Sequence, residues 1–110
     1  MMIQSAHHEQ ETALDARLQA LLTDYVHCLD DDRLEEWPDF FTEEGRYRVI
    51  TRENHEFGLP VSLIYCDGRG MLADRISAMR TANVFEPHTY CHLVGVARIL
   101  ESTETGCRVR

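Results

Sequence analysis

The sequence lacks a long apolar run and an excess of positive charge. No stretch approaches the roughly eighteen apolar residues of a membrane-spanning helix, and the N-terminus shows no basic-then-apolar signal pattern. Eleven basic residues against 19 acidic residues give a formal net charge of −8, which repels phosphate groups and anionic lipids. These absences argue against a nucleic-acid partner and a membrane partner, and we expect a cytoplasmic protein.

Closely spaced cysteines are also absent. Cys28, Cys66, Cys91 and Cys107 lie far apart, whereas zinc sites and redox motifs normally use Cys-x-x-Cys spacing. We therefore expect partly buried free thiols that pack as small hydrophobic side chains in a reducing compartment. The paired cysteine and histidine ligands of a Rieske cluster are missing too, so we expect no metal and no cofactor on this chain.

The length of 110 residues predicts one domain, and its content of 44% hydrophobic and 27% charged residues is typical of globular proteins. Residues 1–10 are polar and without periodicity, which predicts a flexible N-terminal tail before a domain at 11–110. Leucines at three- and four-residue steps then predict a helix from Thr12 to Leu29. Two brief helices follow at 32–37 and 38–41, and their aromatic residues plug one end of the core.

Alternating and apolar runs predict the later elements. These are a strand at 46–51, a polar loop at 52–60, a strand at 61–66, a helix near 71–79, a long strand at 88–102, a hairpin loop at 102–106 and a strand from 107. This order favours an α+β fold with helices packed on one face of a curved, mainly antiparallel sheet. The last strand has only four residues, so we expect the last strands of the sheet to be missing by C-terminal truncation.

Several short motifs resemble one known family. They are Trp37-Pro38-Asp39-Phe40-Phe41, Gly45-Arg46-Tyr47-Arg48, Arg52-Glu53-Asn54, Gly58-Leu59-Pro60, Met71-Leu72-Ala73-Asp74-Arg75-Ile76, and a strand with Tyr90, His92, Leu93 and Val94. In this order and spacing the sequence resembles the small (beta) subunits of bacterial Rieske-type aromatic-ring-hydroxylating oxygenases. The similarity covers about Leu18 to Arg110 and is greatest to the group that acts on aromatic carboxylates such as salicylate, anthranilate or terephthalate.

The resemblance implies a cone like that of nuclear transport factor 2 (an NTF2-like, or cystatin-like, fold), with three helices against a curved sheet. It also implies a non-catalytic structural subunit of an oxygenase in aromatic-compound catabolism. In that family the small subunits form a trimer beneath three large (alpha) subunits. The Rieske 2Fe-2S cluster and the mononuclear iron belong to the large subunit in that family. Many members have arginine directly before the strand histidine, where this chain has Cys91.

Asp30 and His92 support an alternative function. The resemblance places them where cone-shaped enzymes carry an acid–base pair, and a carboxylate fixes the imidazole tautomer and raises its basicity. The alternative is a free-standing dehydratase or isomerase, while the simpler interpretation makes His92 a core or interface residue and Asp30 a helix-border residue. His88 and His92 would lie about 13 Å apart on one strand face, too far to share a metal ion.

Charged residues on the later helix indicate a possible subunit interface. We predict that Asp74 and Arg75 form a pair at a subunit interface, and that His92 also lies at a subunit interface. The other candidates for pairing across subunits are Arg46, Arg48, Arg69 and Arg80, and solvated surface is the default expectation for each of them.

Overall fold

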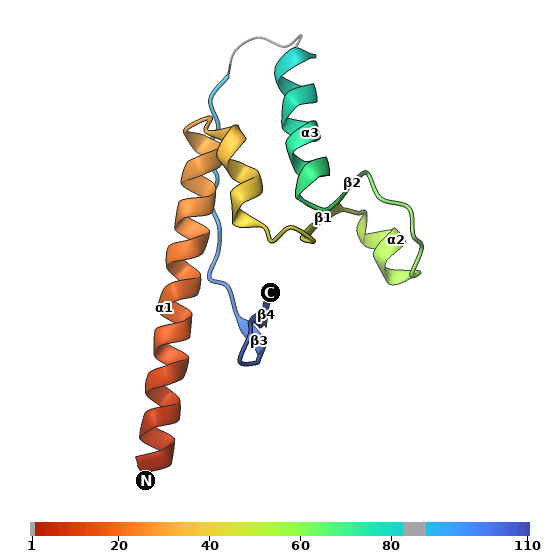
Figure 1. Cartoon of the computed structure of the whole chain (residues 1–110). Helices are drawn as coiled ribbons and strands as arrows, with labels where there is room; N and C mark the ends of the chain where they lie inside the picture. The colour runs from red at the N-terminus through yellow and green to blue at the C-terminus, as the bar shows by residue number, and fades with distance from the viewer. Residues whose placement is uncertain (1, 83–87) are drawn as a thin grey trace.

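The computed structural model describes residues 2–82 and 88–110, with side chains from residue 9 onward (Figure 1). The elements are α1 (Met2–Asp30), the 3-10 helix η1 (Leu34–Phe40), β1 (Arg46–Val49), α2 (Arg52–Glu56), β2 (Ile64–Asp67), α3 (Arg69–Thr81), β3 (Ile99–Ser102) and β4 (Cys107–Val109). Both pairs, β1–β2 and β3–β4, are antiparallel. The predicted α+β class is confirmed.

Helix α1 begins ten residues before the predicted start at Thr12. Residues 2–10 are therefore helical where the sequence predicts a tail, because glutamine, alanine and glutamate are good helix formers that can extend a helix into solvent. The helix ends where Asp32 adopts a left-handed backbone conformation with φ of 58°. The Arg33 amide then donates to the Cys28 carbonyl at 2.9 Å, which closes the final turn.

Two segments after α1 differ from the predicted pattern. The two brief helices predicted at 32–37 and 38–41 form one 3-10 helix, η1, with Pro38 inside it. The Phe41 amide donates to the Pro38 carbonyl at 3.0 Å, which is an i→i+3 bond of the 3-10 type. The predicted loop at 52–60 contains helix α2, because the Thr51 side chain accepts from the Asn54 amide at 3.1 Å and caps it.

The core lies between the C-terminal half of α1, η1, the β1–β2 pair and α3. Its buried side chains are Cys28, Trp37, Cys66, Leu72 and Ile76. The Trp37 indole N–H donates to the Tyr25 hydroxyl at 2.8 Å, and its ring meets those of Phe41 and Tyr47 edge-on with centroids 5.3 and 5.0 Å apart. The predicted aromatic plug is confirmed.

Strands β1 and β2 cover one side of this core. Tyr47 opposes Cys66 and Val49 opposes Ile64, so inward positions alternate with outward positions as the pattern predicts. Only 46–49 of the predicted strand at 46–51 is strand, and the second strand begins at Ile64 rather than position 61. Helix α3 matches its prediction, with Leu72 and Ile76 buried on its core side.

The predicted long strand at 88–102 is wrong for most of its length. Only Ile99–Ser102 is strand, paired with β4 across a register shift. A strand needs a hydrogen-bonded neighbour, and within the described residues 88–97 have no backbone ladder. The described strands form two separate pairs in place of one curved sheet. The radius of gyration is accordingly 17.2 Å, against about 13 Å for a compact chain of this size.

Candidate functional site

Asp30, the last residue of α1, contacts His92 on the segment that runs back along this helix (Figure 1). The carboxylate accepts from the backbone amide of His92 at 3.0 and 2.9 Å, and one oxygen lies 2.5 Å from the imidazole Nδ1. The backbone amide and the imidazole of His92 thus both contact the carboxylate of Asp30. The structure brings together the two residues that the sequence proposes as a pair, although 62 positions separate them.

These hydrogen bonds favour the ionised carboxylate. The His92 side chain, followed by its backbone amide, holds the pKa of Asp30 below its ordinary value of 3.8. A proton on Nδ1 is required for donation to Asp30, which leaves Nε2 of a neutral imidazole as the acceptor. An orientation of this kind suits a general base, and it suits equally well a structural contact between two segments.

A short row of rings continues from this pair. The Tyr90 ring lies 6.0 Å from the His92 ring between centroids, and the Tyr90 hydroxyl contacts Nε2 of His88. The side chains of these three residues are all exposed. The row therefore presents titratable aromatic groups on the surface.

The surroundings of the pair are open. The side chain of His92 is 44% exposed and that of Asp30 is 17% exposed. A hollow of about 550 Å³ lies farther along α1, lined by Glu11, Leu14, Asp15, Val96, Ala97, Arg98, Ile99 and Ser102. It shows that the C-terminal segment runs beside α1, but neither Asp30 nor His92 lines it. An acid–base reaction needs a site that excludes water, and the described surroundings of this pair do not supply one.

The predicted interface pair of α3 is not an ion pair within the described part of the chain. Asp74 is exposed and Arg75 is half-buried, and neither has an ionic partner there. Adjacent positions on a helix point in different directions, so the two side chains cannot readily pair with each other. A role for them at a subunit interface stays a prediction.

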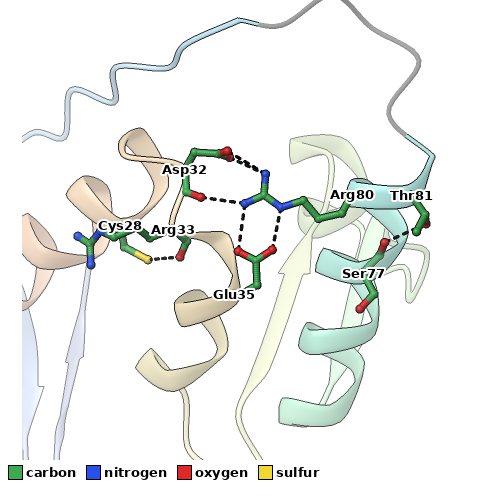
Figure 2. A network of polar contacts seen from close by, with 7 residues as sticks. All are labelled: Cys28, Asp32, Arg33, Glu35, Ser77, Arg80 and Thr81. Carbon is green, nitrogen blue, oxygen red and sulfur yellow. Dashed lines mark hydrogen bonds and ion pairs between the residues drawn. The ribbon is translucent and has the colours of Figure 1, made fainter.

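Arg80 forms a contact that sequence reasoning missed (Figure 2). Its guanidinium donates to both carboxylate oxygens and the carbonyl of Asp32 at 2.8–2.9 Å, and to both oxygens of Glu35 at 2.8 and 3.1 Å. These bonds join the end of α3 to the turn after α1, at Asp32, and to η1, at Glu35, and they raise the pKa of Arg80. The acidic run at 30–32 and Glu35 were visible in the sequence, but their partner was 45 or more positions away.

Metal ligands do not gather in the described residues. Across 2–82 and 88–110, no three histidine, cysteine, aspartate or glutamate side chains lie close enough to hold an ion. The four cysteines are free thiols, with Cys28 and Cys66 buried and Cys91 and Cys107 exposed. Burial raises the pKa of the Cys28 thiol. The predicted packing role thus holds for two of the four. No helix in the described ranges is long and apolar enough to cross a membrane.

Comparison with known proteins gives a consistent family. The family model for the ring hydroxylating beta subunit matches residues 25–110. The anthranilate 1,2-dioxygenase small subunit of Burkholderia cepacia is 46% identical over 69 residues, which are 63% of this chain and 43% of that protein. The terephthalate 1,2-dioxygenase terminal oxygenase component subunit beta 1 of Comamonas sp is 38% identical over 91 residues, which are 83% of this chain and 59% of that protein.

A solved structure has the same fold. It is a beta subunit assigned to an aromatic-ring-hydroxylating dioxygenase of Novosphingobium aromaticivorans, with a TM-score of 0.79 and 40% sequence identity. The match covers 91% of this chain and 62% of that one, and it confirms the predicted NTF2-like fold. The chain spans between about two fifths and three fifths of the length of these relatives.

Proposed function

Because the chain belongs to the family of ring-hydroxylating beta subunits, we propose that it is the structural small subunit of an aromatic-ring-hydroxylating oxygenase. The observation that carries this proposal is the agreement of sequence and fold, with 40% identity at a TM-score of 0.79. The named relatives act on anthranilate and terephthalate. An aromatic carboxylate is therefore the substrate class that we propose for the whole oxygenase.

The partner in this proposal is a large subunit that carries the Rieske cluster and the mononuclear iron. The lack of a three-ligand group in the described residues supports this division, because an iron site needs several converging donors. Self-association of the small subunit, as a trimer beneath the large subunits, is part of the same proposal. The match to a subunit of a terminal oxygenase component supports an assembly of more than one chain type.

We also propose a cytoplasmic location. The support is that all four cysteines are free, including the exposed Cys91 and Cys107. Exposed thiols persist in reducing compartments and tend to oxidise outside them.

Within this function, Asp30 and His92 hold the C-terminal segment against the end of α1. Three hydrogen-bond contacts converge on one carboxylate, which suits a structural attachment. The 2.5 Å contact at Nδ1 also favours the second candidate, a dehydratase or isomerase with His92 as base. The exposure of His92 weighs against that candidate.

Reconstitution with a large subunit tests the proposal. The chain is co-expressed with the Rieske large subunit encoded in the same genome, and ring hydroxylation of anthranilate and terephthalate is measured for the co-purified complex. We expect a complex in which the wild-type chain and His92→Ala support similar turnover once assembled. Absence of any complex contradicts the structural role. Full loss of turnover in an assembled, equally stable His92→Ala complex would favour the acid–base candidate.

A further inference from the structure

The outward positions of the β1–β2 pair carry two arginines that differ in how they are paired. Arg46 lies opposite Asp67 in the register, and its guanidinium donates to the Asp67 carboxylate at 3.2 Å. Arg48, two residues on, lies opposite Tyr65 and has no ionic partner among the described residues. One face of the strand pair therefore holds an arginine with an internal carboxylate beside an arginine without one.

Arg48 borders a hollow of about 320 Å³, whose other lining residues are Pro60, Ser62 and Tyr65. Arg48 comes from β1 and Tyr65 from β2, while Pro60 and Ser62 belong to the segment that leads into β2. The guanidinium and the two hydroxyl groups make no hydrogen bond to other protein atoms within the described part of the chain. Their hydrogen-bonding capacity is available to a ligand in the hollow.

The walls of the hollow are held by the chain itself. The Leu63 amide donates to the Val49 carbonyl at 2.7 Å, which continues the β1–β2 pairing by one residue. The Asn54 side chain donates to the Val61 carbonyl at 3.4 Å and fixes the segment between the two lining residues that precede β2. A site whose main chain is fixed in this way loses little conformational freedom when a ligand binds.

The lining side chains match a flat ligand with a carboxylate. A guanidinium binds a carboxylate through two parallel hydrogen bonds, and this fork is specific for a planar anion. The rings of Tyr65 and Pro60 are flat walls against which an aromatic ring packs. The hydroxyl of Ser62 donates to a carboxylate oxygen or to a polar ring substituent. The volume is at the low end of the range of about 300–1,000 Å³ for small-molecule sites, which suits a ligand of about one ring.

Charge around the hollow favours a ligand with a single negative charge. Residues 46–67 contain three arginines and three acidic residues and are neutral, so the remaining residues account for the whole net charge of −8. A multiply charged anion such as phosphate is repelled by this acidic remainder more strongly than a monoanion is. The charge of Arg48 is balanced by one carboxylate.

We propose that the Arg48 hollow binds a small aromatic monocarboxylate, with the carboxylate on the Arg48 guanidinium and the ring against Tyr65 and Pro60. The site shares no residue with the Asp30–His92 contact. The inference follows from the lining of the hollow and does not depend on the proposed function.

NMR titrations of the isotope-labelled full chain test the inference, with benzoate as the probe. We expect saturable shifts of the amides at 60–65 with a dissociation constant of about 1 mM. Arg48→Ala should weaken binding by at least about tenfold, whereas Arg46→Ala, which removes the same charge from the same face, should change it by less than about threefold. Arg48→Gln repeats the test with a longer side chain, and circular dichroism melts verify that each variant is folded.

Three further probes check the ligand class. Benzamide has the ring without the charge, acetate has the carboxylate without the ring, and inorganic phosphate has more charge and no ring. We expect each of them to bind at least about tenfold more weakly than benzoate.

Each contrary result overturns the inference. Absence of saturable shifts with up to about 20 mM benzoate shows that the hollow takes no such ligand. Wild-type affinity in the folded Arg48 variants, or an equal loss in Arg46→Ala, removes the role of Arg48. Acetate or phosphate binding as tightly as benzoate shows a general anion contact. The titrations measure neither assembly nor turnover, so their failure leaves the proposed function intact.

Discussion

Residues 25–82, which we call the body, and residues 88–110, which we call the arm, contain apolar side chains in similar patterns but bury them very differently. The body contains every member of the buried core cluster and the side chains packed against it. In the arm, Leu93 and Val96 are 93% and 91% exposed, and no described side chain is fully buried. The hairpin β3–β4 and the Asp30 contact are what organise the arm.

The difference shows that an apolar pattern specifies a strand only together with its neighbours. β1 and β2 pair over four residues each and are backed by α3 and η1, so their inward side chains are covered. Residues 88–97 have comparable apolar content, but within the described chain they have no paired strand, and their side chains remain exposed except for the half-buried Ala97. Burial stabilises by removing apolar area from water, and that requires a surface to pack against.

The largest contrast is expected between two leucine truncations. Leu72→Ala removes a side chain that is 0% exposed in the body and should lower the free energy of unfolding by about 2–5 kcal/mol. Leu93→Ala removes an exposed side chain from the arm and should change it by less than about 0.5 kcal/mol. Urea unfolding of both variants, followed by Trp37 fluorescence, measures the two values. Equal destabilisation would show that the arm is packed against the body.

A smaller effect is expected from Asp30→Asn, which weakens the attachment of the arm without touching the core. The folded-state pKa of Asp30 is lowered, so the contact is fully present above the ordinary value of 3.8 and is lost as pH falls through the lowered pKa. Asparagine should remove this acid transition and speed hydrogen exchange at the His92 amide, while body amides keep their protection. NMR exchange rates across pH 2–7, an interval of about five units around that value, provide the measurement. Unchanged protection of His92 would mean that other contacts hold the arm.

The smallest expected effect is a difference in cysteine reactivity between the body and the arm, which is measured without changing the sequence or the fold. Cys91 and Cys107 of the arm are exposed, whereas Cys28 and Cys66 of the body are buried. Burial also raises the pKa of Cys28, which reduces the reactive thiolate. We expect iodoacetamide to modify two thiols per native chain quickly and the other two only after unfolding, with peptide mass spectrometry identifying them. Rapid labelling of Cys66 in the folded protein would show that the β1–β2 pair opens.

The sequence predicted the body better than the arm. Leucine spacing along α1, the alternation at Tyr47 and Val49 and the buried face of α3 are local signals. Each predicted an element of the right type, although α1 matches its prediction only at its C-terminal end. Two elements of the body were predicted wrongly, namely the loop that contains α2 and the two brief helices that form η1. The Thr51 side-chain cap and the 3-10 geometry around Pro38 depend on local hydrogen bonds that composition does not reveal.

The candidate site shows the same limit. Asp30 and His92 could be proposed as a pair only through family resemblance, since no local pattern connects positions so far apart. The Arg80 contact with Asp32 and Glu35 was missed for that reason, although all three residues are charged and visible. Long-range partners depend on how the helices pack, and sequence periodicity describes each helix separately.

The left-handed backbone at Asp32 carries a consequence for sequence variation at this position. Two independent demands meet there, because the residue must adopt φ of 58° and must present a carboxylate to Arg80. Glycine meets the first demand and glutamate the second, whereas aspartate and asparagine tolerate this conformation better than most residues and only aspartate adds the charge. Homologues that keep arginine at the position of Arg80 should therefore vary little at the position of Asp32, and those that lose the arginine should drift there toward glycine or asparagine.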